Sequence, residues 1–150
     1  MSFLRHPGCP FAERTLHSLR DAKAAQPEVE WVAVSHASRE TTEEWTRSVG
    51  GAGGVEVVVD EERGLYAAWG VGRTGLGHFM GPRSLGAVVR LAREGIHNRH
   101  PQGSRWQGAG TFAVDPSGTV RWHHLPEHAG DLPDLGRAAE AALGGAGQHG

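Results

Sequence analysis

The stretch FLRHPGCPFA, residues 3–12, organises the sequence. A short apolar run ends at Pro7 and Gly8, the only cysteine follows as Cys9, and Pro10 begins a helical pattern. Proline is favoured at the first position of a helix because an N–H there would have no partner inside the helix. Cys9 is therefore predicted to be the N-cap of a helix, where free N–H groups and the positive end of the helix dipole stabilise a thiolate.

Charged neighbours of Cys9 bear on its reactivity. Arg5, and His6 when protonated, are predicted to lower the pKa of the thiol, whereas Glu13 opposes them from one turn into the helix. A neutral His6 imidazole is a candidate acceptor for the thiol proton. A second interpretation stays open, because a free cysteine often behaves as a small buried hydrophobe and a strand would hold His6 apart from Cys9.

Composition and charge restrict the classes of protein to which the chain can belong. A length of 150 residues suits one domain, and a net charge of −2 offers no basic field for nucleic acid. One cysteine excludes an intramolecular disulfide. No apolar run approaches the ~20 residues that span a membrane, and the N-terminus does not resemble a signal peptide. We expect a soluble, cytoplasmic protein that binds neither nucleic acid nor membrane.

The first half of the chain alternates between strand-like and helix-like segments. In chain order, the predicted segments are a strand over 2–6, a helix over 10–25, a strand over 29–35, a helix capped by Ser38 or Thr41, a strand over 55–59 and a short helix capped by Asp60. Such alternation favours right-handed crossover connections between parallel strands.

The second half departs from this alternation. Its predicted parts are an insertion over 71–109 that contains a helix over 83–93, a hairpin of strands 111–115 and 119–124 around Pro116-Ser117-Gly118, a helix over 132–143 capped near Asp131, and a disordered tail over 144–150. The expected fold class is α/β, with a mixed sheet of about five strands and an inserted helix in one domain over residues 1–143.

Three stretches carry a resemblance to a known family. They are residues 3–11, residues 59–66 and residues 110–118, and they occur in the order that the family uses. The chain resembles the thioredoxin superfamily, in its peroxiredoxin-like AhpC/TSA branch. The resemblance implies a three-layer α/β/α sandwich and a thiol oxidoreductase whose Cys9 reduces a small-molecule peroxide or exchanges with a disulfide.

The active-site motif departs from the family pattern. Ala12 stands where a dithiol oxidoreductase has its second cysteine, so reduction is expected to need an external thiol or a thioredoxin-type reductant. Ser2 and His6 replace the proline and threonine of the peroxidase motif, and Ala109 replaces its arginine. Gly110 stands near the place of the thioredoxin cis-proline.

The candidate site residues follow from the motif and its surroundings. Cys9, His6 and Arg5 are the candidate catalytic residues. The candidate substrate-binding residues are Gly8, Pro10, Phe11, Ala12, Gly110 and Arg105, of which Arg105, like Arg99, is a candidate replacement for the missing arginine. An alternative function stays open, namely a redox-inactive, thioredoxin-fold small-molecule binding protein or a non-redox enzyme. A homodimer is a further possibility.

Neither a metal nor a nucleotide cofactor is expected. His123 and His124 would point to opposite faces of a strand, and His97 with His100 belongs to no zinc motif. The glycine pattern over residues 70–75 follows a helix, whereas a phosphate-binding loop follows a strand. The histidines are predicted to lie on the surface or to form hydrogen bonds.

Overall fold

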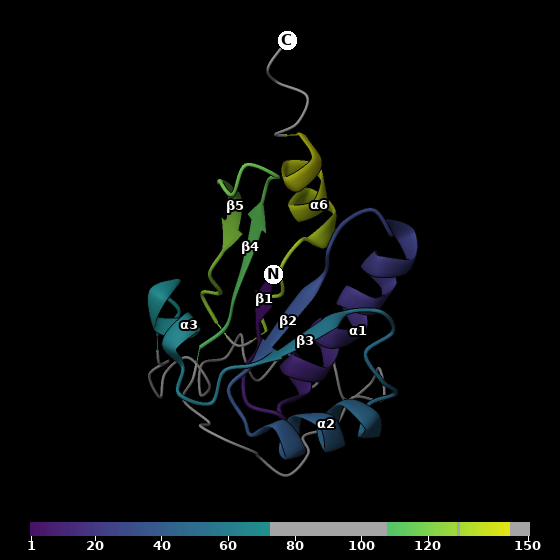
Figure 1. Cartoon of the computed structure of the whole chain (residues 1–150), viewed down its shortest axis with the longest axis vertical. Helices are drawn as coiled ribbons and strands as arrows, with labels where there is room; N and C mark the ends of the chain where they lie inside the picture. The colour runs from purple at the N-terminus through teal and green to yellow at the C-terminus, as the bar shows by residue number, and fades with distance from the viewer. Residues whose placement is uncertain (73–107, 129, 145–150) are drawn as a thin grey trace.

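The computed structural model describes residues 1–72, 108–128 and 130–144. Its elements are β1 (Ser2–Phe3), α1 (Pro10–Ala25), β2 (Val32–Ser35), α2 (Arg39–Ser48), β3 (Glu56–Val59), α3 (Gly64–Ala68), β4 (Gly110–Val114), β5 (Val120–His124) and α6 (Leu135–Gly144). Figure 1 shows these elements around a central sheet.

The strands form one mixed sheet of five strands in the order β3-β2-β1-β4-β5. Strands β1, β2 and β3 are parallel, and Ser2 lies opposite Ala33. Strand β4 is antiparallel to β1 and forms a hairpin with β5. This is the thioredoxin-like α/β arrangement that the sequence predicts, with its antiparallel part at one side.

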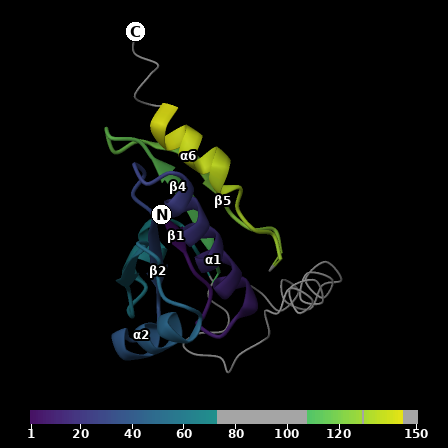
Figure 2. The same ribbon diagram turned by 90° about the vertical axis from the view of Figure 1, so that its right-hand side faces the viewer.

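Helices cover both faces of the sheet (Figures 1 and 2). Successive residues of a strand point to opposite faces, so Leu4 enters one apolar cluster and Phe3 the other. The first cluster packs α1, α2 and α6 on the sheet, and the second packs α3 on the opposite face. A three-layer sandwich follows, with the first turn of α1 beside the larger cluster.

Local chemistry explains where most helices begin. Pro10 is the first residue of α1, as predicted, and the Ser38 hydroxyl caps α2 by accepting from the Thr41 N–H at 3.1 Å. Asp60 caps α3 through its carboxylate, as predicted.

Some predicted boundaries are wrong. Strand β2 begins at Val32 instead of residue 29, because a turn in which the Val29 N–H donates to Gln26 O precedes it. Strand β1 ends at Phe3 instead of residue 6. The last helix begins at Leu135, because the Asp134 carboxylate accepts from the Arg137 N–H at 3.1 Å.

Asp131, the predicted cap of the last helix, has another role. Its carboxylate accepts from the Glu127 N–H at 2.9 Å and lies 3.3 Å from His124 Nε2. It therefore organises the loop between β5 and α6.

The predicted insertion lies mostly outside the described residues, as do its helix and almost all of the predicted tail. The Gly108 N–H donates to Gly72 O at 2.9 Å, so these two residues lie side by side. No helix in the described part is long and apolar enough to cross a membrane. The cytoplasmic location and the homodimer stay predictions.

Candidate active site

The carboxyl ends of the parallel strands meet at one edge of the sheet. Arg5 and His6 follow β1, His36 follows β2 and Asp60 follows β3. Loops at this edge bring together side chains that are far apart in the sequence, which is where ligands bind in open α/β sheets. Cys9 lies in the first of these loops, directly before α1.

Cys9 is the N-cap of the 16-residue helix α1, as the sequence predicts. Its backbone is extended, its N–H donates to His6 O at 3.1 Å, and its carbonyl accepts from the Glu13 N–H at 3.2 Å. The N–H groups of Phe11 and Ala12 lie near the sulfur and favour its thiolate form. The thiol makes no side-chain capping hydrogen bond, but these N–H groups are close enough to lower the pKa of Cys9.

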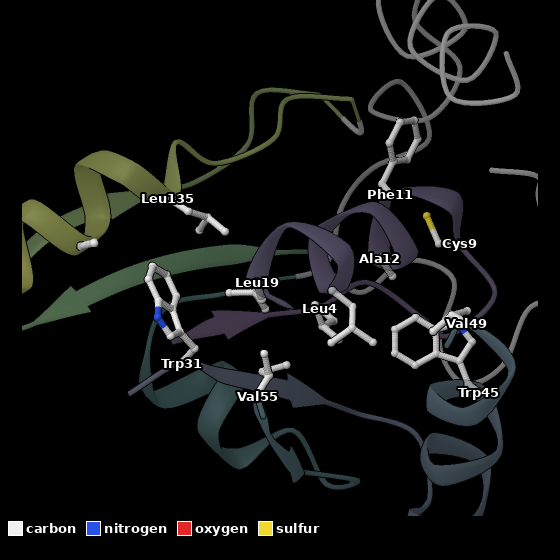
Figure 3. Packing of buried hydrophobic residues seen from close by; sticks show 13 residues of the cluster. Leu4, Cys9, Phe11, Ala12, Leu19, Trp31, Trp45, Val49, Val55 and Leu135 are labelled. Carbon is white, nitrogen blue, oxygen red and sulfur yellow. The ribbon is translucent and has the colours of Figure 1, made fainter. Parts of the chain in front are cut away.

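The burial of Cys9 contradicts the prediction of a lowered pKa. The residue is only 4% exposed and belongs to the larger apolar cluster, where Figure 3 shows it at the first turn of α1. Burial raises the pKa of the Cys9 thiol, and this outweighs the N–H groups of Phe11 and Ala12 and the charge of Arg5, which lower it. The sequence motif indicates the stabilising groups, but it does not reveal how far Cys9 is removed from water.

Arg5 is the charge that couples most directly to the thiol. The residue is 3% exposed, and burial lowers the pKa of its guanidinium while the Cys9 thiolate would raise it. The same pairing lowers the pKa of Cys9. A buried guanidinium close to a cysteine stabilises the anionic form of sulfur more strongly than an exposed one would.

His6 is buried in the same loop. Its Nδ1 lies 3.2 Å from the carbonyl oxygen of Pro7, and its charge acts on His36. The roles of His6 as proton acceptor and of Arg5 as charge stabiliser stay predictions.

The predicted substrate-binding residues separate into three groups. Gly8, with a φ of 98°, and the residues 10–12 form the turn and first helical residues around the thiol. Gly110 lies opposite Phe3, but a Cβ there would be 3.0 Å from a Leu125 methyl, so packing accounts for the glycine. Arg105 lies outside the described residues.

The structure adds residues that the motif does not single out. His36 is buried after β2, and its ring packs edge-on against Tyr66 at 5.5 Å. The Tyr66 hydroxyl lies 2.7 Å from Leu4 O and 2.8 Å from Val34 O. Arg63 has a left-handed backbone with a φ of 59°. His36 follows β2, and Arg63 and Tyr66 follow β3. A position after the carboxyl end of a parallel strand is the sequence signal that could have identified these residues as part of the site.

The described residues contain no group of three potential metal ligands. His123 stacks on Phe112 with ring centroids 6.3 Å apart, whereas the neighbouring His124 pairs with Asp131. The two histidines therefore do not act together as a chelating pair. His97 and His100 lie outside the described residues.

The fold and the loop around Cys9 define a thioredoxin-like protein with one cysteine at the start of its first helix. A family model described as AhpC/TSA antioxidant enzyme matches residues 15–128, which is more than half of the chain. The chain belongs to this family, the peroxiredoxin-like branch of the thioredoxin superfamily. The matched range begins after Cys9, so the cysteine motif and the family match are separate observations. A search of the curated proteins gave no significant match.

Proposed function

We propose that this protein is a single-cysteine thiol peroxidase. The observation that carries the proposal is the position of Cys9, which caps α1 next to the buried Arg5 in a chain of the AhpC/TSA family. The family match supports thiol-dependent peroxidase chemistry, and Cys9 is the only thiol in the chain.

The proposed reaction has two half-reactions. The Cys9 thiolate attacks one peroxide oxygen, the O–O bond breaks, and the second oxygen leaves as an alcohol or water after it takes a proton. The sulfenic acid formed on Cys9 then reacts with an external thiol, which releases water and leaves a mixed disulfide. A second external thiol attacks this mixed disulfide, which restores the Cys9 thiol and releases the two external thiols as one disulfide. One peroxide is thus reduced for each pair of external thiols oxidised.

The groups around the sulfur have distinct tasks in this proposal. The N–H groups of Phe11 and Ala12, together with Arg5, stabilise negative charge on sulfur and on the departing oxygen. His6 is the candidate group for proton transfer, because its backbone carbonyl already binds the Cys9 N–H and holds the two residues in one turn. Ala12 provides no second thiol, so the reductant comes from outside.

The burial of Cys9 sets the expected pH dependence. Because burial raises the pKa of the thiol, only a small fraction is thiolate at neutral pH. The rate of Cys9 oxidation should therefore increase as the pH rises from 7 through 9, by up to about tenfold for each pH unit. A rate that is independent of pH in this range would mean that the thiol is already ionised.

The test is peroxide consumption with dithiothreitol as the external thiol. The wild-type protein should consume hydrogen peroxide or tert-butyl hydroperoxide, and Cys9→Ser should lose this activity completely. Arg137→Gln is a matched control, because it alters an exposed residue of α6. Equal peroxide consumption by wild-type and Cys9→Ser proteins would refute the proposal.

The burial of Cys9 also favours a second candidate function. The raised pKa of Cys9 suits a thioredoxin-like protein that has lost redox chemistry and binds a small molecule. A cavity of about 360 Å³ lies at the other end of the strands, lined by Trp31, Val32, Phe112 and Ala138 among others. An apolar dye that binds equally to the wild-type and Cys9→Ser proteins, without any peroxide consumption, would favour this alternative.

A further inference from the structure

Among the residues that the structure describes, two buried nitrogen atoms at this edge of the sheet lack a hydrogen-bond partner and belong to side chains that act on each other. They are Nε2 of His36 and Nη1 of Arg63. His36 is only 5% exposed. A buried polar atom without a partner is destabilising, so each such atom in a native structure calls for an explanation.

The two side chains belong to one site. The Arg63 guanidinium is close enough to His36 to disfavour a positive charge on the imidazole, and His6 acts in the same direction. His36 follows β2 and Arg63 precedes α3, at the edge of the sheet that also carries Cys9. The site therefore combines positive charge and hydrogen-bond donors from several loops.

The nearby carboxylate does not neutralise this charge. Asp60 favours the charged form of His36, but less strongly than Arg63 and His6 disfavour it. Both Asp60 oxygens are used in capping, where they accept from the N–H groups of residues 64–66 at 2.9 to 3.2 Å. Asp60 is therefore the negative neighbour that acts on His36, but its effect is weaker than that of Arg63 or of His6, and its oxygens already accept hydrogen bonds from the start of α3.

The backbone of Arg63 is consistent with a specific role for its side chain. Its φ of 59° and ψ of 28° lie in the left-handed region, which side chains other than glycine, asparagine and aspartate rarely adopt. Glycine would fit this position without strain. An arginine here places a guanidinium where the fold alone would favour a smaller residue.

We propose that His36 and Arg63 form a binding site for a carboxylate group on a substrate that reacts at Cys9. This assignment deepens the proposed function and rests on it. An arginine offers two parallel N–H donors to a carboxylate, and an imidazolium adds a third charge-assisted hydrogen bond. The carboxylate belongs to an organic hydroperoxide or to the small thiol that reduces the oxidised Cys9.

Carboxylate binding should be coupled to proton uptake. In the free site, burial, Arg63 and His6 lower the pKa of His36 to about 4, against the opposing effect of Asp60. Tyr66, which packs against the ring, stays neutral because burial raises its pKa. A bound carboxylate favours the imidazolium, so affinity should increase as the pH falls from 7.5 to 5.5, by up to about tenfold for each pH unit.

The binding test uses propionate and the full-length Cys9→Ser protein, with affinity measured by calorimetry. Arg63→Asn, which suits a left-handed backbone, should weaken binding by about tenfold or more. Arg63→Lys should restore part of the affinity, and His36→Gln should remove the pH dependence. Arg137→Gln, at an exposed position, should leave affinity unchanged.

Three results would overturn the site. The first is that the folded Cys9→Ser protein does not bind propionate. The second is that Arg63→Asn leaves the affinity for propionate unchanged. The third is that Arg137→Gln weakens propionate binding as much as Arg63→Asn does. Thermal unfolding of each variant establishes that it is folded. If Arg63→Asn does not fold, the shift of the His36 ring nitrogen signals on addition of propionate to the Cys9→Ser protein decides the question, because an empty site would give no shift.

The substrate test separates the two sources of the carboxylate. Oxidation of Cys9 is compared between tert-butyl hydroperoxide and a hydroperoxide with a carboxylate, and its reduction between 2-mercaptoethanol and 3-mercaptopropionate. The half-reaction that uses the site should prefer the charged reagent, and Arg63→Asn should reduce this preference about tenfold, whereas Arg137→Gln should keep it. No preference in either half-reaction would refute the substrate assignment.

The two proposals fail in different ways. If propionate binds but Cys9 reacts with no peroxide, the proposed function is wrong and the carboxylate site stands as a binding site. If Cys9 reduces tert-butyl hydroperoxide but propionate does not bind, the proposed function stands and the carboxylate site is wrong.

Discussion

The Cys9 sulfur is subject to two opposing physical effects. Its place at the start of α1 and next to Arg5 stabilises the thiolate, whereas burial among apolar side chains destabilises it. Burial is the stronger effect, so the thiol is protonated at neutral pH. In the proposed reaction, its reactivity depends on the small thiolate fraction and on the stabilisation that Arg5 and the N–H groups of Phe11 and Ala12 give to the departing oxygen.

Replacement of Arg5 tests this balance. In Arg5→Gln the sulfur loses a stabilising charge, so the pKa of Cys9 should rise further, and alkylation by iodoacetamide at pH 7 should slow by about threefold to tenfold. The measurement is the pH profile of alkylation in wild-type and variant proteins. Arg137→Gln provides the control for a general loss of charge. Identical profiles for Arg5→Gln and wild type would show that Arg5 does not act on Cys9.

His36 makes the protein sensitive to mild acid. Its pKa is about 4 in the folded protein against 6.5 in the unfolded chain, so the unfolded state binds more protons between these values. The free energy of unfolding should therefore fall as the pH decreases from about 6.5 to 4, by on the order of 2 kcal/mol from this residue.

Urea denaturation at several pH values measures this effect. His36→Gln should reduce the dependence on pH in this window, whereas His123→Gln, which alters an exposed histidine of β5, should leave it in place. The same slope in wild type and His36→Gln would mean that His36 is not held in its neutral form.

Among the elements, α3 depends on a single carboxylate. Asp60 follows β3 and accepts from three consecutive N–H groups at the start of the helix. Asp60→Ala leaves these groups without their partner, so the free energy of unfolding should decrease by about 1–2 kcal/mol. Chemical denaturation checks the value, with the exposed neighbour Glu62→Ala as control. A decrease of equal size in the control would argue against the capping role.

Most elements of the fold are predictable from local sequence patterns. Pro10, Ser38 and Asp60 identify the starts of three helices, because each residue type has a defined task at a helix start. The start of α6 is less predictable, since Asp131 and Asp134 are both good caps. The structure selects Asp134, and Asp131 instead pairs with His124, a contact between two segments that local sequence does not reveal.

The candidate site is only partly predictable for the same reason. The motif around Cys9 indicates its helix-capping position, but the exposure of the sulfur depends on side chains from α2 and other segments, such as Trp45 and Val49. His36 and Arg63 come together only through the order of the strands. A sequence pattern records neighbours along the chain and not neighbours across the sheet.

For the molecule as a whole, Tyr66 links the layers at the active edge. Its ring packs on Phe3 with centroids 4.9 Å apart, and its hydroxyl lies within hydrogen-bond distance of the carbonyl oxygens of Leu4, which follows β1, and of Val34 in β2. Tyr66→Phe leaves these oxygens without that donor, so the free energy of unfolding should decrease by about 1–3 kcal/mol.

Urea denaturation of Tyr66→Phe checks this prediction. Ser48→Ala is a suitable control, because it alters an exposed residue whose hydroxyl donates to Trp45 O within α2 and should change stability by less than about 0.5 kcal/mol. Unchanged stability in Tyr66→Phe would show that the hydroxyl contributes little to the joining of the layers.

The most direct test of the central claim is mass spectrometry of the protein after brief treatment with one equivalent of hydrogen peroxide at pH 8. Peroxidase chemistry at Cys9 predicts a sulfenic acid on the peptide that contains Cys9. This product is one oxygen atom heavier than the thiol, or is detected as the thioether that dimedone forms with it as water leaves, and it should form faster than in a peptide of the same sequence. Addition of dithiothreitol before the trap should abolish the adduct. Oxidation no faster than in the free peptide would contradict the account.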